Sequence, residues 1–302
     1  MNMSTKILKS LVFSLGVAFF YACSGGNSGE ENNAEGTKDT SNKEKVSHAQ
    51  IVLYNIPSPL ETSQLLKEAG AKYDGVYTNP ISNTKEYKSS ESKALNLGVY
   101  AADLCYAGVF ENAQESMSFL KSVNSLSGDL GVGSAFNENT ADRIEKNKKN
   151  KDSVMSIISE AFWEADSYLK ENNRSGVSSL LISGGWIEAM FISSKIYQKT
   201  KSEKIKNRIV SQPQANALNS IIAMLQIEKL NPETQTVLDG LKKLNESYNK
   251  ISSSKTETKS TTDEAAHKTK LETSGGVNVT DELLAEIIKG IDELRSKVIG
   301  LK

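Results

Sequence analysis

Two acidic residues lie inside strongly apolar stretches of the chain, where a carboxylate could act as a general acid or base. Asp103 stands three residues from both Tyr100 and Tyr106, so on a helix these three side chains share one face. Glu188 follows two glycines and a tryptophan in a second apolar stretch. Carboxylates removed from water can exchange protons near neutral pH or hold a cation. These four residues form the predicted polar core or ligand site.

The rest of the chain gives these acids little catalytic support, so a structural role is the alternative interpretation. The only two histidines, His48 and His267, lie in polar stretches, and no nucleophile motif accompanies the acids. A di-iron bundle would need repeated Glu-x-x-His motifs, which the sequence lacks. A buried acid can instead be satisfied by hydrogen bonds, for example Asp103 by a tyrosine hydroxyl. We therefore predict no catalytic residue, no metal ligand, no cofactor and no enzymatic activity.

A second feature with binding potential is a run of basic residues between positions 195 and 208, opposed within the run only by Glu203. Such a run could bind an acidic glycan, a lipid phosphate or an acidic protein, or it could be a solvated helix end. The net charge of the whole chain is only -1, which argues against nucleic acid as a partner. The predicted anion-binding patch comprises Lys199, Lys201, Lys204, Lys206 and Arg208, with Lys195 at its edge.

Helices must position these residues, because helical periodicity runs through most of residues 48–251. Residues 91–112 are apolar on all sides, which indicates a central helix. Residues 177–199 form a second apolar helix, whose Gly184-Gly185 pair suits close packing. The central helix carries a matching stripe of small residues, namely Gly98, Ala101, Cys105 and Gly108. We expect another helix to approach it closely along that stripe.

The remaining segments complete a helical domain over residues 48–251. Further helices are predicted at about 58–70, 114–126, 154–169, 203–211, 214–228 and 232–248. Only residues 51–56 have an extended character, and the glycines of 127–133 indicate a helix end rather than a phosphate loop. The predicted fold is therefore all-α, an irregular antiparallel helical bundle with a short extended segment at its N-terminus.

The C-terminal part is predicted to be a linker followed by one amphipathic helix. Residues 252–278 are mainly Ser, Thr, Lys and Glu, which is typical of a flexible linker. Residues 279–300 carry a continuous apolar seam, made by Leu284, Ile287, Ile288, Ile291, Leu294 and Val298. Because exposing such a seam to water is costly, the helix must dock, either on its own body or on a partner.

The first 22 residues are typical of a processing signal. Two lysines precede an apolar run, Leu11 to Tyr21, that would span roughly 16 Å as a helix. That is about half of a bilayer's hydrocarbon core, too short for a comfortable transmembrane anchor. The polar stretch after Cys23, residues 23–47, lacks the apolar residues needed for a core and is predicted to be a flexible tether.

The sequence Ala22-Cys23 directly after the apolar run resembles the lipobox of bacterial lipoproteins, although Phe20 and Tyr21 differ from the usual leucine and small residue. The resemblance is to lipoproteins of Bacteroidota-type bacteria, many of which have helical bodies. It implies acylation of Cys23, and Ser24 after the cysteine implies sorting to the outer membrane, facing the periplasm or the cell surface. It implies no activity.

These features together predict a lipid-anchored envelope lipoprotein whose helical body is a non-enzymatic binding or scaffold protein. The membrane would be its partner through the lipid anchor, and an envelope protein or a glycan would be its ligand. The alternative is an envelope hydrolase or glycan-active enzyme that uses Asp103 and Glu188. That alternative requires the two carboxylates to converge in one open cleft.

Overall fold

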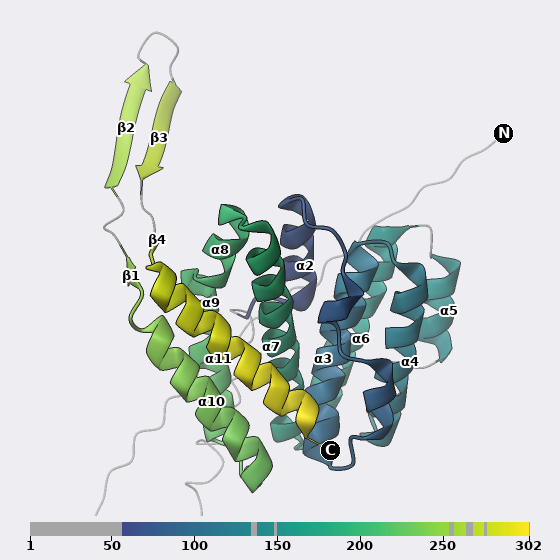
Figure 1. Cartoon of the computed structure of the whole chain (residues 1–302). Coiled ribbons are helices and arrows are strands. Elements are labelled where there is room, and N and C mark those ends of the chain that lie inside the picture. The colour runs from purple at the N-terminus through teal and green to yellow at the C-terminus, as the bar shows by residue number, and fades with distance from the viewer. Residues whose placement is uncertain are drawn as a thin grey trace, which may run out of the picture. The chain divides into compact units, whose positions relative to one another are not determined.

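A computed structural model describes residues 56–133, 138–147, 150–253, 257–263, 268–274 and 277–301. The signal segment, Cys23, the tether and residues 51–55 of the expected extended segment lie outside these residues. The described body is an all-α antiparallel bundle, which confirms the predicted fold class (Figure 1). Its helices begin with α2 (Pro59–Glu68), where Ser58 and Glu61 form a reciprocal capping box at the N-terminus.

Two long central helices, α3 (Ser90–Val109) and α7 (Ser175–Thr200), form the most extensive contact of the bundle. Every residue of α3 from Ala94 to Ala107 is buried, as predicted for a helix that is apolar on all sides. Among the described helices, α7 alone has the length and composition of a membrane span. Most of that stretch is buried by neighbouring helices, which is also expected for the core helix of a bundle.

Glycines set the distance between α3 and α7. A Cβ atom added at Gly98 would overlap the carbonyl oxygen of Leu181, and one added at Gly184 would overlap that of Leu95. The backbones of the two helices therefore touch where both sequences carry glycine. The predicted close approach along the small-residue stripe is confirmed at Gly98.

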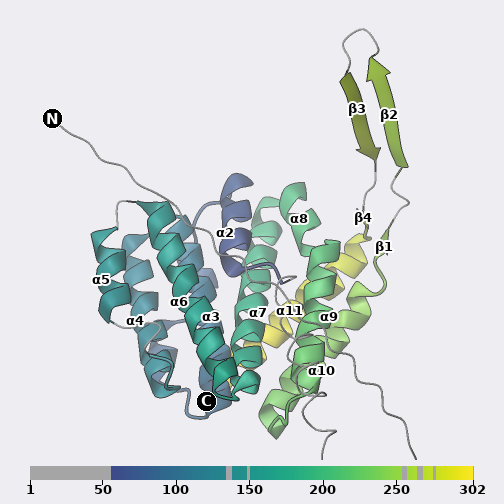
Figure 2. The same ribbon diagram turned by 180° about the vertical axis from the view of Figure 1, so that it is seen from behind.

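Two helices pack beside this pair, and a third packs on one of them. α4 (Ala113–Asp129) lies against α3, and its glycine-rich end forms a turn with Gly131 at a φ of 72°, as expected for a helix end. α6 (Lys151–Glu171) contacts both central helices, and Figure 2 shows it beside them. The short α5 (Glu138–Lys146) lies on α6 and was not predicted.

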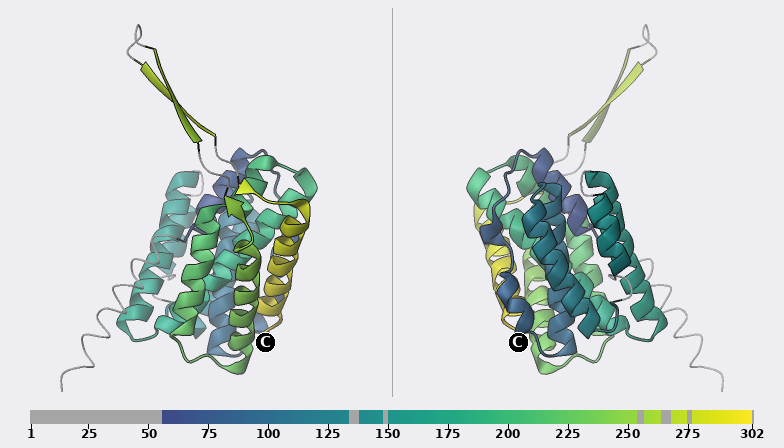
Figure 3. Two further views of the ribbon diagram at one scale, coloured as in Figure 1. Left: turned by 90° about the vertical axis from the view of Figure 1, so that its left-hand side faces the viewer. Right: turned by 90° about the vertical axis from the view of Figure 1, so that its right-hand side faces the viewer.

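The C-terminal half adds the remaining helices and settles where the last one docks. After α8 (Glu203–Ile209), α9 (Gln212–Gln226) packs on α7 and α10 (Pro232–Tyr248). The last helix, α11 (Asp281–Gly300), packs against α10, α7 and α3 (Figure 3). Its apolar seam is buried, so it docks on its own body.

The segment 252–278, predicted as a linker, contains two short pairs of extended segments in its described residues. β1 (Ser252–Ser253) pairs with β4 (Val277–Asn278), and β2 (Glu257–Asp263) pairs with β3 (Lys268–Ser274), both antiparallel. The register places Lys259 opposite Glu272 and Asp263 opposite Lys268.

The loop between α2 and α3 crosses the polar side of α3. It contains two short 3-10 turns, Gly75–Tyr77 and Ile81–Lys85. This loop supplies main-chain partners to the polar residues of α3.

Candidate functional site

Helices α3, α7 and α11 bring three charged residues together in the interior of the bundle. Asp103 and Glu188 are both 0% exposed, and the side chain of Arg295 is 11% exposed. We refer to Asp103, Glu188 and Arg295 as the buried charge centre. The two acids that the sequence singled out, Asp103 and Glu188, both lie in this centre, and each influences the pKa of the other.

Arg295 meets Glu188 through two parallel hydrogen bonds. Its Nε atom donates to Oε2 and its Nη2 atom donates to Oε1, each over 3.1 Å. The guanidinium carbon also lies 4.5 Å from the centre of the Phe191 ring. This two-point geometry with ring stacking suits arginine and could not be reproduced by lysine.

Asp103 completes the centre as a neutral acid. Burial raises the pKa of Asp103 well above its usual range, and the neighbouring charge of Glu188 raises it further. Burial also raises the pKa of Glu188, but Arg295 opposes that rise, so the proton shared by the two acids resides on Asp103. A protonated Asp103 can donate to Glu188, while its Oδ2 accepts the backbone N–H of Asn79 at 3.0 Å.

A proton on Asp103 accounts for the lack of a hydrogen-bond donor near its Oδ1 atom in the described part of the chain. Oδ1 of Asp103 is buried and meets no hydrogen-bond donor among the described residues. An ionised carboxylate in that position would be costly, whereas a protonated one uses Oδ1 as a donor. The centre therefore holds one negative charge, on Glu188, and one positive charge, on Arg295.

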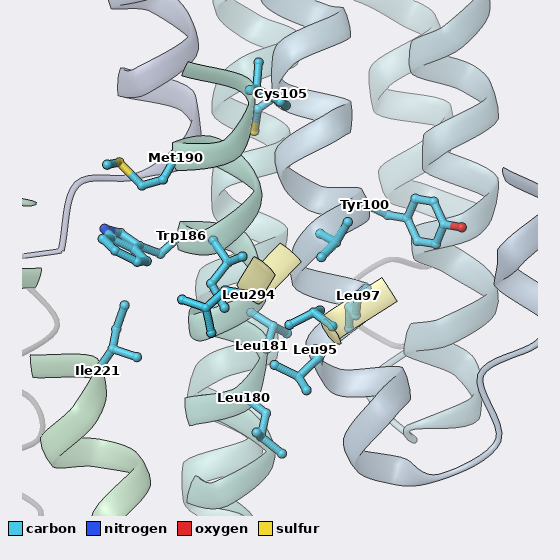
Figure 4. Close-up of a cluster of buried hydrophobic side chains, with 14 of the residues drawn as sticks. Leu95, Leu97, Tyr100, Cys105, Leu180, Leu181, Trp186, Met190, Ile221 and Leu294 are labelled. Atoms are coloured by element: carbon cyan, nitrogen blue, oxygen red, sulfur yellow. The ribbon is translucent and has the colours of Figure 1, made fainter. Parts of the chain in front are cut away.

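Tyr100 and Tyr106 form hydrogen bonds with the loop between α2 and α3 rather than with Asp103. The hydroxyl of Tyr100 donates to the carbonyl of Pro80 at 2.8 Å, and that of Tyr106 accepts the N–H of Asp74 at 3.0 Å. Figure 4 shows the Tyr100 hydroxyl pointing away from α7. The expectation that a tyrosine hydroxyl satisfies Asp103 is wrong, because the main chain of the loop takes that place.

A chain of amides links the centre to the end of α11. Asn79 donates through Nδ2 to the Tyr87 hydroxyl at 2.9 Å and to Asn96 at 3.4 Å. Asn96 in turn donates to the carbonyl of Val298 at 3.0 Å. All three polar side chains are buried, so the network joins the loop, α3 and α11 in one interior cluster.

Arg295 was missed in the sequence, although a signal for it exists. The chain has only four arginines among 36 basic residues, and this one directly follows Leu294 of the apolar seam. Arginine is the cation best suited to a buried two-point pair. A lone arginine beside a seam, in a chain rich in lysine, therefore indicates a buried acid opposite.

Solvent does not reach the two acids of the centre. The carboxylates converge, but both are fully enclosed, so the open cleft required by the enzymatic alternative is missing at these two residues. Within the described part of the chain, no three His, Cys, Asp or Glu side chains gather closely enough to hold a metal ion. The arrangement is suited to fixing three helices in register.

The predicted anion-binding patch is spread over several ion pairs. Lys199 pairs with Asp74 at 2.9 Å, Lys204 with Glu68 at 3.1 Å and Lys206 with Glu203 at 3.7 Å. At the edge of the patch, Lys195 pairs with Asp292 at 2.6 Å.

The remaining two members have other surroundings. Lys201 lies 5.4 Å from the Tyr197 ring centre. Burial lowers the pKa of Arg208. Neighbouring acids thus offset much of the positive charge, and anion binding stays a prediction.

A half-open cavity of about 180 Å³ lies between the start of α2 and helices α3, α6 and α7. Its lining is mainly apolar and includes Ala101, Cys105, Ile158, Phe162, Leu181 and Trp186. Figure 4 shows three of these, Cys105 on α3 and Leu181 and Trp186 on α7. No sequence pattern predicted this cavity, because its existence depends on the relative positions of α3, α6 and α7.

Comparison with known proteins finds no matching family model, no similar curated protein and no similar solved structure.

Proposed function

We propose that the chain is a lipid-anchored protein of the bacterial cell envelope, with a helical body that acts as a non-enzymatic binding or scaffold protein. The anchor would be Cys23, acylated after removal of residues 1–22, as in the Bacteroidota-type lipoproteins that this segment resembles. Outer-membrane sorting belongs to the same proposal.

The observation that carries the anchor is the order of three features around Cys23. A short apolar run ends in Ala22, the cysteine follows, and a polar stretch extends to residue 47. Two or more acyl chains would bury enough methylene groups to make attachment effectively permanent. The polar stretch would then separate the folded body from the membrane surface.

The observation that supports a non-enzymatic body is the closed charge centre. Asp103 and Glu188 are the acids that the sequence singled out for chemistry, and neither is exposed. Their contacts with Arg295 and Asn79 are those of a structural network. No observation favours the hydrolase alternative over this interpretation.

The anchor is tested by Cys23→Ala, with Cys105→Ala as the matched control, because the chain has only these two cysteines. Cells are given an alkyne analogue of palmitate and separated into membrane and soluble fractions. We expect Cys23→Ala to abolish labelling, whereas Cys105→Ala should keep both the label and membrane association. A Cys23→Ala protein that still fractionates with membranes at precursor mass would contradict the proposal.

Sorting is tested by Ser24→Asp in the acylated protein. We expect the unmodified chain in the outer-membrane fraction of a density gradient and Ser24→Asp shifted toward the inner membrane. The binding role is tested by crosslinking in intact cells followed by mass spectrometry. A defined crosslinked species that depends on Cys23 would support an envelope partner, and its absence at all crosslinker lengths would count against one.

A further inference from the structure

We propose that the cavity between α2, α3, α6 and α7 is a binding site for a small, uncharged, apolar ligand such as an aromatic ring or a branched alkyl group. The proposal deepens the binding role given above by naming a ligand class. It does not depend on the lipid anchor, so the two can fail separately.

The cavity exists because α3 presents small residues to its neighbours. Gly98, Ala101 and Cys105 follow one another at spacings of three and four and all line the cavity. At Gly98 the backbone of α3 touches α7, but farther along the helix the side chains are too short to fill the space beside α6. A space of about 180 Å³ remains.

The size of the cavity matches a small ring. An engineered apolar cavity of ~150 Å³ stays dry and binds benzene. The present cavity is slightly larger at about 180 Å³, and it is open on one side. Ile158 and Trp186 are buried in its wall, while Phe162 and Ile182 are partly exposed. An apolar ligand would therefore gain burial without a large rearrangement of the helices.

Two of the polar side chains in the lining, Asp166 and Ser58, already have hydrogen-bond partners. The carboxylate of Asp166 accepts hydrogen bonds from Ser178 and from Lys170, the latter at 2.6 Å. The hydroxyl of Ser58 accepts the N–H of Glu61 in the capping box. These groups have no need of a polar ligand.

The side-chain heteroatoms of Trp186 and Cys105, two buried residues of the wall, are also unsuited to a charged ligand. The indole N–H of Trp186 donates to Gln214 at 2.8 Å, which leaves only the apolar ring for the cavity. Burial raises the pKa of Cys105 to about 12, so its thiol is neutral. A charged ligand would lose its hydration here without gaining a partner, which excludes ions from the proposed class.

The test uses the fluorescence of Trp186 in the full chain carrying Cys23→Ala and Trp163→Phe. Because the chain has two tryptophans, Trp186 is then the only one. Iodobenzene is the probe, since its heavy atom quenches a tryptophan with which it is in contact. We expect saturable quenching by iodobenzene and only weak, linear quenching by iodide ion. Toluene should compete with iodobenzene, and the benzylammonium ion should not.

A pair of variants on α6 locates the site. Ser159 lines the cavity, whereas Ser167 is exposed on the same helix and does not. We expect Ser159→Leu to weaken iodobenzene binding at least tenfold and Ser167→Leu to leave it unchanged. The competition between toluene and benzylammonium needs no variant, so it decides the question even if Ser159→Leu fails to fold.

Three results would overturn the proposal. The first is quenching by iodobenzene that never saturates, and the second is equal competition by toluene and benzylammonium. The third is binding seen only after residues 51–54 are replaced by serine, which would make the chain's own apolar segment the occupant. Loss of membrane attachment in Cys23→Ala has no bearing on any of these outcomes.

Discussion

Arg295 on α11 and Glu188 on α7 form a two-point ion pair, with both nitrogen-to-oxygen distances at 3.1 Å. The two residues are 107 positions apart in the chain, and Glu188 is completely buried. The pair fixes the register of α11 on the core, because a shift by one residue would leave an unpaired charge in the interior. Because a buried ion pair often adds no net stability over a well-packed apolar pair, we infer that this pair serves to specify the position of α11.

The first prediction follows from the cost of an unpaired buried charge. Arg295→Met should lower the free energy of unfolding by ~3–5 kcal/mol, because Glu188 would lose its counterion. The double variant Arg295→Met, Glu188→Met should recover most of that loss, since no charge remains. Urea unfolding of all three proteins measures the effect.

Lys243→Ala is the control, because Lys243 and Glu293 form an exposed pair at 3.9 Å whose loss should cost less than ~1 kcal/mol. A double variant no more stable than Arg295→Met would contradict this account.

The second prediction concerns pH and rests on the raised pKa of Asp103. In the folded protein Asp103 keeps its proton, whereas in the unfolded chain it releases the proton near its ordinary pKa of 3.8. The folded state therefore binds more protons above that pH. The stabilisation of the folded protein by the proton on Asp103 is therefore complete below about pH 4. It is lost as the pH rises toward the pKa of Asp103 in the folded protein.

Asp103→Asn isolates that contribution, because an amide keeps both a donor for Glu188 and an acceptor for Asn79. We expect the variant to fold and to show a flatter decline of unfolding free energy with rising pH than the unmodified protein. The measurement is urea unfolding at a series of pH values. The exposed Asp239→Asn should keep the original slope. An unchanged slope in Asp103→Asn would show that Asp103 is ionised in the folded protein.

Local sequence patterns were sufficient to predict most of the helices and the central position of α3. Capping residues such as Ser58 and apolar periodicity act within a few residues, so they can be read directly from the chain. The contact between Gly98 and α7 was also foreseeable, because only a close neighbour explains such glycines in buried helices. The fold class followed from these local signals.

The partners within the buried centre could not be predicted, because they depend on tertiary arrangement. Asp103 is satisfied by the backbone of Asn79, and no residue type marks a backbone amide as a future partner. Arg295 lies in the centre because α11 docks on the body of the same chain. The sequence alone did not decide between that docking and docking on a partner. Helix α5 was missed because its sequence is strongly charged. It gains its stability by lying on α6, with Ile144 buried.

The third prediction tests the contact between α3 and α7. Gly184→Ala should destabilise the protein by ~3 kcal/mol or more, because the new methyl group would overlap the backbone of Leu95 and push the helices apart. Gly128→Ala is the matched control in α4, where a Cβ atom would meet nothing within 4 Å. There the same substitution should be neutral or stabilising by ~0.5–1 kcal/mol, since alanine favours helix. Thermal unfolding followed by circular dichroism compares the two, and equal effects would contradict the close contact.

The fourth prediction concerns the only thiol that remains in a Cys23→Ala protein, Cys105. It is buried, and burial raises its pKa to about 12, so almost none of it is thiolate at pH 8. An ordinary thiol with a pKa of ~8.5 would be about one quarter ionised at that pH, and the thiolate is the reactive form. We therefore expect the folded protein to react with a charged aromatic disulfide reagent at least ~10³-fold more slowly than the same chain in urea. Cys105→Ala in the same background gives the blank rate. A folded-state rate within tenfold of the unfolded rate would mean that reagent and water reach Cys105 through the cavity, and that the wall around it is not dry.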